Sequence, residues 1–189
     1  MTDPQVLSNE TVYRGHVYDV TRTRVRFPDG VEVEHSVVRH RGAVGLIVLD
    51  EQERWLLVRQ WRIPAGRELL EIPAGGLEEG EEPVATAHRE VREETGFAAA
   101  TMERLGGLWM APGFCTEYMH FFLATGLTHD PLPGDEDERL SPPVTYTLDD
   151  VAAAIESGEI QDGKTVAAMH LYQRYLYRGG ARGGGPAGA

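Results

Sequence analysis

The chain has 189 residues, of which 41% are hydrophobic and 25% charged, and its formal net charge at pH 7 is −12. This composition is typical of a globular protein with a sizeable core, and it excludes collagen-like, disordered and membrane-spanning classes. The longest apolar run, residues 43–49, is too short to cross a bilayer. A strongly acidic chain without a basic stripe is also a poor candidate for a partner of nucleic acid.

The N-terminus and the cysteine content predict a cytoplasmic protein. The first ten residues, MTDPQVLSNE, have neither the basic start nor the apolar stretch of a secretory signal. Cys115 is the only cysteine, so an intrachain disulfide is excluded.

The N-terminal part of the chain predicts β-structure. Residues 1–10 are polar and are expected to be loose. Residues 11–40 alternate β-branched and polar side chains and predict a hairpin with its turn at residues 28–30. Residues 43–49 form a continuous apolar run typical of a buried central strand, and a second strand is expected near residues 55–61.

One helix is predicted over residues 83–95. Pro83 suits the first helical turn, and Gly96 suits the left-handed position that ends a helix. Val84, Ala87 and Val91 share the arc that we expect to dock on a sheet.

The remaining elements complete an α+β protein. Strands are expected near residues 105–110, 118–124 and 144–147, and helices over about residues 148–157 and 165–177. We expect a mixed β-sheet between helices, an α/β/α sandwich, with an N-terminal antiparallel β appendage. The predicted organisation is a loose N-terminus (1–10), the appendage (11–42), the main domain (43–178) and a glycine-rich disordered tail (179–189).

The excess of acid is concentrated in two short segments. Residues 71–94 contain eight glutamates against two arginines, and residues 135–138 read Asp-Glu-Asp-Glu. Both segments can be explained as solvated acidic surfaces, which is the common case for a charge run. The alternative is a site for divalent cations, because like charges packed together repel unless something neutralises them.

The predicted helix favours the cation site. Glu90, Glu93 and Glu94 fall within an arc of roughly 100° on one helix face. Glutamates three and four residues apart destabilise a helix, whereas a hard cation with oxygen ligands reverses that effect. Arg89 can orient one of these carboxylates through a charge-assisted hydrogen bond.

The surrounding sequence contains a complete signature motif. Residues 75–97 read GGLEEGEEPVATAHREVREETGF and fill all nine specified positions of the Nudix box, a loop–helix–loop motif. The matching residues are Gly75, Glu81, Arg89, Glu90, Val91, Glu93, Glu94, Gly96 and Phe97. The chain therefore resembles the Nudix hydrolases, and its main domain resembles a Nudix hydrolase domain.

The resemblance implies hydrolysis of a nucleoside diphosphate linked to another group, with Mg²⁺, or alternatively Mn²⁺, held by glutamates of the box. By this analogy Glu90 and Glu94 are direct metal ligands, and Glu93 is a further ligand that also takes part in catalysis. The backbone carbonyl of Ala74 is expected to add a ligand. Glu81 is expected to pair with Arg89 rather than to bind metal.

Two further stretches narrow the substrate. Residues 58–62 read VRQWR, residues 69–76 read LLEIPAGG, and Pro112 lies 15 residues after Phe97. These features are similar to those of ADP-ribose pyrophosphatases, which implies cleavage of ADP-ribose to AMP and ribose 5-phosphate. A broader pyrophosphatase acting on other ADP-sugars, NADH or FAD remains an alternative, as does a nucleotide sensor without catalysis.

The same resemblance suggests residues for the substrate. Arg62 is expected to contact the diphosphate, with Arg59 as the second candidate, and Glu71 is expected at the ribose end. The segment Pro112-Gly113-Phe114 is expected to shape the substrate loop.

A loop glutamate is expected to act on the attacking water. We favour Glu138, with Glu136 next, because related enzymes carry a glutamate on a mobile loop in this part of the chain. Ser141-Pro142-Pro143 departs from the family pattern, because proline cannot donate a hydrogen bond in a strand ladder.

The N-terminal β appendage implies a homodimer. Exposed strand edges tend to find a partner, and similar enzymes pair by exchanging this region, so that both subunits line each site. Arg39 and an aromatic side chain such as Tyr18 or Phe27 are candidates to reach the partner's substrate.

Overall fold

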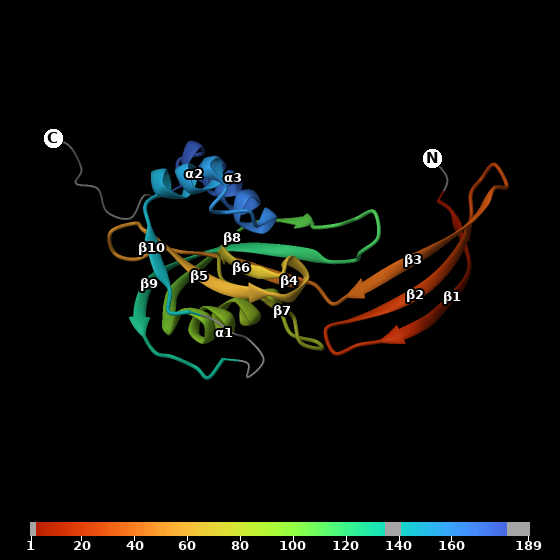
Figure 1. Cartoon of the computed structure of the whole chain (residues 1–189), viewed down its shortest axis with the longest axis horizontal. Coiled ribbons are helices and arrows are strands. Elements are labelled where there is room, and N and C mark those ends of the chain that lie inside the picture. The colour runs from red at the N-terminus through yellow and green to blue at the C-terminus, as the bar shows by residue number, and fades with distance from the viewer. Residues whose placement is uncertain (1–2, 135–140, 181–189) are drawn as a thin grey trace. The chain divides into compact units, whose positions relative to one another are not determined.

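The computed structural model describes residues 3–134 and 141–180. The chain divides into two compact units, Met1–Gly42 with Leu108–Met119, and Ala43–Gly107 with His120–Ala189 (Figure 1). Within the described ranges, none of the helices combines the length and the apolar character that a membrane span requires. The acidic run at residues 135–138 and residues 181–189 of the predicted tail lie outside the described residues.

The first unit is built on a three-stranded antiparallel sheet in the order β1-β2-β3. Its strands are β1 (Gln5–Arg14), β2 (Tyr18–Arg26) and β3 (Glu32–His40). The predicted hairpin turn is confirmed: the Gly30 N–H donates to the Phe27 carbonyl at 2.9 Å, and Gly30 has a φ of 86°, which glycine adopts without a steric penalty.

The expectation of a loose N-terminus was wrong from Gln5 onward. Strand β1 is polar and exposed along most of its length, so it lacks the alternating apolar pattern that reveals a strand in sequence. Backbone pairing with β2 holds it in place, and Thr23 Oγ1 donates to Asn9 Oδ1 at 2.8 Å.

The second unit contains two further sheets. One has the order β7-β4-β9-β8, with strands Ala74–Gly76, Ala43–Val48, Tyr118–His129 and Phe97–Trp109. The other has the order β10-β5-β6, with strands Val144–Tyr146, Trp55–Arg62 and Arg67–Glu71. A short 3₁₀ helix, η1 (Ile63–Ala65), connects β5 to β6. Every residue of β4 is buried, as its continuous apolar run predicts.

Helices flank the strands of the second unit. Helix α1 (Pro83–Thr95) contacts β4 and β7. On the opposite side α3 (Gly163–Tyr177) contacts β4, and α2 (Leu148–Ser157) contacts β10 (Figure 1). The predicted α+β sandwich is therefore confirmed. Helix α3 begins two residues before the predicted start, because Asp162 caps it by accepting a hydrogen bond from the Thr165 N–H at 2.9 Å.

The buried face of α1 fixes the position of its glutamates. Ala87 and Val91 are fully buried in a core cluster that includes Val44, Leu46 and Phe122. Val84 was expected on the same face but is exposed, because it lies in the first helical turn, before the buried residues of the helix begin at Thr86.

Candidate functional site

Helix α1 has the bounds that its local signals predict. Pro83 occupies the first turn, where its missing N–H leaves no helical bond unmade. Gly96 has a φ of 79°, and its N–H donates to the Arg92 carbonyl at 3.1 Å, which ends the helix. These ends set the register that brings Arg89, Glu90 and Glu94 to the strand β7.

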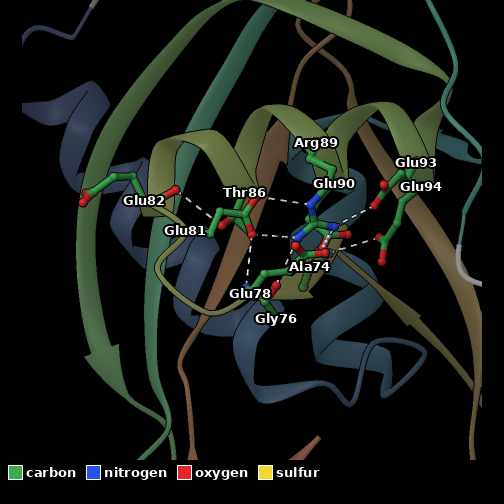
Figure 2. A network of polar contacts seen from close by, with 10 residues as sticks. All are labelled: Ala74, Gly76, Glu78, Glu81, Glu82, Thr86, Arg89, Glu90, Glu93 and Glu94. Carbon is green, nitrogen blue, oxygen red and sulfur yellow. Dashed lines mark hydrogen bonds and ion pairs between the residues drawn. The ribbon is translucent and has the colours of Figure 1, made fainter. Parts of the chain in front are cut away.

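Arg89 holds three of the glutamates in one cluster. Its Nη1 donates to Glu90 Oε1 at 2.6 Å and to Glu93 Oε2 at 2.8 Å. Its Nη2 donates to Glu81 Oε2 at 3.1 Å and to the Gly76 carbonyl at 3.2 Å. Figure 2 shows the guanidinium between Glu81 on one side and Glu93 on the other. The predicted pairing of Glu81 with Arg89 is confirmed.

The electrostatics favour the charged forms of Arg89 and Glu81. Burial acts to lower the pKa of Arg89, but the hydrogen bond to Glu81 and the charge of Glu90 outweigh it and raise that pKa. The hydrogen bond from Arg89 in turn lowers the pKa of Glu81. The arginine therefore offsets the repulsion between the carboxylates and orients them.

Glu90 and Glu94 reach back to the chain at β7. Both side chains are buried, and Glu94 Oε2 accepts a hydrogen bond from the Ala74 N–H at 3.1 Å. The Glu90 carboxylate lies in the space that a Cβ on Gly75 would occupy. The structure thus brings the predicted ligands Ala74, Glu90 and Glu94 together.

The residues present fit a divalent cation. Within residues 3–134 and 141–180, no three acidic, histidine or cysteine side chains are already arranged as a metal centre. The donor set is nevertheless suitable, because carboxylate and backbone carbonyl oxygens are the ligands that hard cations such as Mg²⁺ prefer. The open space above Gly75 is what allows the Glu90 carboxylate to lie beside the backbone there.

Arg62 and Glu71 form a second charged group. Arg62 Nε and Nη2 donate to Glu71 Oε1 and Oε2 at 2.8 and 2.6 Å, a bidentate pair. The Glu71 bond raises the pKa of Arg62 against the effect of burial, and the charges of Glu71 and Glu94 contribute in the same direction. Glu94 of the first cluster is therefore within electrostatic reach of Arg62.

Glu71 lies deeper than its predicted role at the ribose suggests. The residue is 1% exposed, and Lys164 Nζ also donates to its carboxylate. A contact between Glu71 and a substrate ribose stays a prediction.

Arg59, the second candidate for the diphosphate, points to a different partner. Its Nη2 donates to Glu159 Oε1 at 2.8 Å, and Tyr146 donates its hydroxyl to the same oxygen at 2.9 Å. This bond raises the pKa of Arg59 and lowers that of Glu159. Arg59 and Arg62 therefore bind different carboxylates, Glu159 and Glu71.

Four other candidates belong to the first unit. Arg39 Nε donates to Thr21 Oγ1 at 3.2 Å. Residues 112–114 form a tight turn in which the Phe114 N–H donates to the Ala111 carbonyl at 3.1 Å. The Val38 N–H donates to the Phe114 carbonyl at 2.8 Å, so the turn lies beside the strand that carries Arg39. Phe114 itself is exposed.

Glu136 and Glu138 lie outside the described residues.

Lys164 and Asp162 were not among the candidates from sequence. Lys164 Nζ lies 3.1 Å from Asp162 Oδ1 in addition to its bond with Glu71. One signal was present: Lys164 is the only lysine in the chain, although 17 of its residues are arginine.

Comparisons with known proteins agree with the site. A family profile described as NUDIX domain matches residues 39–169. An ADP-ribose pyrophosphatase of Bacillus subtilis is 35% identical over 90% of this chain and 93% of its own. A GDP-mannose pyrophosphatase of Citrobacter koseri is 34% identical over 89% of this chain and 91% of its own. A crystal structure of an ADP compounds hydrolase has a TM-score of 0.83 and 26% identity, and the match covers 95% of this chain and 97% of that one.

Proposed function

The chain belongs to the Nudix family of hydrolases, and we propose that it hydrolyses the diphosphate bond of ADP-ribose to give AMP and ribose 5-phosphate. The observation that carries this proposal is the cluster of carboxylates held by Arg89 against the backbone of residues 74–76. Like charges packed together repel each other, and the single guanidinium of Arg89 bonds three carboxylates of the cluster. A divalent cation would supply the positive charge that the cluster still lacks.

Nudix hydrolases use divalent metal ions, and Mg²⁺ is our proposal for the ion in this chain. Glu90 and Glu94 would hold it directly, with Glu93 and the Ala74 carbonyl as further ligands. When bound, such an ion neutralises phosphate charge and makes water more acidic. Arg89 orients Glu90 and Glu93 through the bonds from its Nη1.

Arg62 is the proposed contact for the diphosphate. A guanidinium carries five N–H donors in a rigid fork, and its bonds to Glu71 engage Nε and one N–H of Nη2. The side chain is 35% exposed, so its remaining donors can meet an anionic oxygen. We propose Arg59 as an accessory cation at most, because Glu159 already binds it.

A glutamate of the acidic run is proposed to orient the attacking water and to accept its proton. Glu138 is the first candidate and Glu136 the second. A carboxylate with an ordinary pKa near 4.3 is a weak base at pH 7, but it suffices when the water is already acidified. If Glu138→Gln and Glu136→Gln both keep near-normal turnover, this part of the proposal is wrong.

The proposed assembly is a homodimer formed through the N-terminal β region, and the proposed location is the cytoplasm. Exposed apolar side chains of the first unit support the dimer. Val6, Val12 and Tyr13 lie on β1, and Val17 and Val31 lie in the connections between the strands; exposed apolar groups of this kind are typical of protein interfaces. Arg39, Tyr18 and Phe27 are proposed to reach the substrate of the partner subunit.

Broader nucleotide-diphosphate hydrolysis is the second candidate. The names of the similar proteins include a GDP-mannose pyrophosphatase and an ADP compounds hydrolase, so proteins similar to this chain differ in the substrates that their names give. A nucleotide sensor is less favoured, because all nine specified positions of the box are filled.

A substrate panel tests the proposal. The protein is incubated with Mg²⁺ and, separately, ADP-ribose, ADP-glucose, GDP-mannose, NADH and FAD, and nucleotide products are separated and quantified. We expect AMP from ADP-ribose at the highest kcat/KM of the panel. Turnover confined to GDP-mannose, NADH or FAD would displace ADP-ribose as the substrate, and tight binding without turnover would indicate a sensor.

A further inference from the structure

Lys164 is buried at the start of α3, where both of its charged partners are acidic. Its side chain is 9% exposed, and its Nζ donates to Glu71 Oε2 and lies 3.1 Å from Asp162 Oδ1. Burying a charged ammonium is costly unless it is paired and hydrogen-bonded. The position of Lys164 therefore depends on these two carboxylates, and theirs depends on it.

The contact between α3 and the end of β6 involves two adjacent residues on each side. Beside the Lys164–Glu71 pair, the Ile72 N–H donates to Thr165 Oγ1 at 2.9 Å. Thr165 also donates from its backbone N–H and its Oγ1 to Asp162 Oδ2, at 2.9 and 2.6 Å. Two neighbouring contacts of this kind restrain the orientation of the Glu71 carboxylate as well as its position.

Glu71 passes this restraint to Arg62. Its two oxygens each accept one bond from the Arg62 fork, so any rotation of the carboxylate turns the guanidinium plane. The charges also balance: Arg62 and Lys164 offset Glu71 and Asp162. Without Lys164, Arg62 would be the only cation bonded to a carboxylate that is 1% exposed.

We propose that Lys164 is a positioning residue for the reaction: by sharing the charge and fixing the orientation of Glu71, it holds the Arg62 guanidinium with its outer donors directed to the substrate diphosphate. The inference rests on the proposed function of Arg62. Asp162 is proposed to assist this positioning, because it pairs with Lys164 and also caps α3.

A double-mutant cycle distinguishes positioning from simple packing. Lys164→Met removes the charge and keeps the length of the side chain. We expect it to raise KM for ADP-ribose about tenfold while kcat changes by less than about threefold, since the lost interaction concerns substrate binding. In an Arg62→Ala background the same change should raise KM by less than about twofold, because the residue through which Lys164 acts is gone.

The control is Gln161→Met in the same loop, which should leave KM unchanged. Gln161 is exposed, and its side-chain oxygen accepts a hydrogen bond from Arg67 at the surface. Circular dichroism and the Tm of each variant report the fold. Should Lys164→Met fail to fold, Asp162→Asn carries the same cycle, because asparagine also caps a helix but lacks the charge that holds Lys164.

An NMR measurement reports the position of the Arg62 side chain in the absence of substrate. In a protein labelled with ¹⁵N-arginine, the Arg62 Nε–H signal is assigned by its loss in Arg62→Ala. Its shift should change and its exchange with water should accelerate in Lys164→Met or Asp162→Asn, and stay the same in Gln161→Met.

The outcomes separate the inference from the proposed function. If the wild type does not cleave ADP-ribose but cleaves another nucleotide of the panel, the proposed substrate is wrong and the cycle is measured on that nucleotide. If the wild type turns over normally and Lys164→Met leaves KM and the Arg62 signal unchanged, or raises KM equally in both backgrounds, Lys164 is a structural clamp only and the inference is overturned.

Discussion

Gly75 and Glu90 share one small volume between β7 and α1: a methyl group on residue 75 would overlap the Glu90 carboxylate. Fourteen residues of the box separate the two positions in the sequence, yet in the fold the Glu90 carboxylate occupies the place of a side chain at residue 75. Gly75 is required here for space, and its lack of a side chain allows a buried carboxylate to lie beside the backbone.

Gly75→Ala is therefore expected to displace Glu90 and to lower kcat/KM by roughly 100-fold, because small misplacements of catalytic groups have effects of this size. Gly76→Ala is the matched control, since a Cβ at residue 76 meets no atom within 4 Å. Steady-state kinetics and circular dichroism on both variants check the prediction. Equal activity of the two variants would mean that the position of Glu90 is unimportant.

Arg62 and Arg59 should differ sharply in their response to the same substitution. Arg62→Lys loses the bidentate fork toward Glu71 and should raise KM about tenfold. Arg59→Lys changes an exposed ion pair with Glu159 and should alter KM by less than about twofold. Initial rates over a range of ADP-ribose concentrations give both values. A larger effect at Arg59 would reverse the assignment.

A pH-dependent contribution to stability is expected at the turn between β4 and β5. Burial acts to raise the pKa of Asp50, but hydrogen bonds from the Arg54 N–H and side chain and from the Gln52 N–H lower it below its ordinary value of 3.8. A carboxylate with a lowered pKa in the folded state stabilises the protein above its unfolded pKa, and the contribution is lost as pH falls.

Asp50→Asn should accordingly cost about 1 kcal/mol at pH 7, with a difference from wild type that shrinks as the pH falls below 3.8. Urea unfolding between pH 7 and pH 3 measures it, and Glu51→Gln, at an exposed neighbour, controls for the loss of one charge. A difference that stays constant down to pH 3 would contradict the assignment.

The N-terminal sheet should mediate dimerisation. Sedimentation of the wild type at micromolar concentration should give the mass of two chains. Tyr13→Ser, at an exposed aromatic side chain of β1, should weaken the dimer at least about tenfold. Tyr177→Ser, at a still more exposed tyrosine at the end of α3, should leave it intact. A monomeric wild type would refute the dimer.

Features with local causes were predictable from the sequence. The bounds of α1 follow from Pro83 and Gly96, and the pairing of Glu81 with Arg89 spans one loop and two helical turns. The buried strand β4 follows from an apolar run. In each case the residues that decide the structure are close together in the chain.

Features that depend on residues far apart in the chain could not be predicted from the sequence. The bond between Glu71 and Lys164 joins positions 93 residues apart, and neither residue has a local signal for the other. The first part of β1, up to residue 10, was expected to be loose, because backbone pairing with β2 holds it and its mostly polar side chains resemble those of a loop. Val84 was misplaced because helical periodicity gives the face of a helix but not where its contact with the core begins.

The central claim is that the carboxylates on α1 exist to hold divalent metal ions at a phosphoanhydride. Titration calorimetry of MgCl₂ into the protein in the presence of AMP, compared with the variant Glu90→Gln/Glu94→Gln, tests it most directly. Glu78→Gln/Glu79→Gln is the matched control, because it removes two charges from the same acidic segment. We expect that only the Glu90 and Glu94 changes abolish ion uptake and, with it, cleavage of ADP-ribose. Unchanged uptake and cleavage in that variant would show that these carboxylates do not hold the ion.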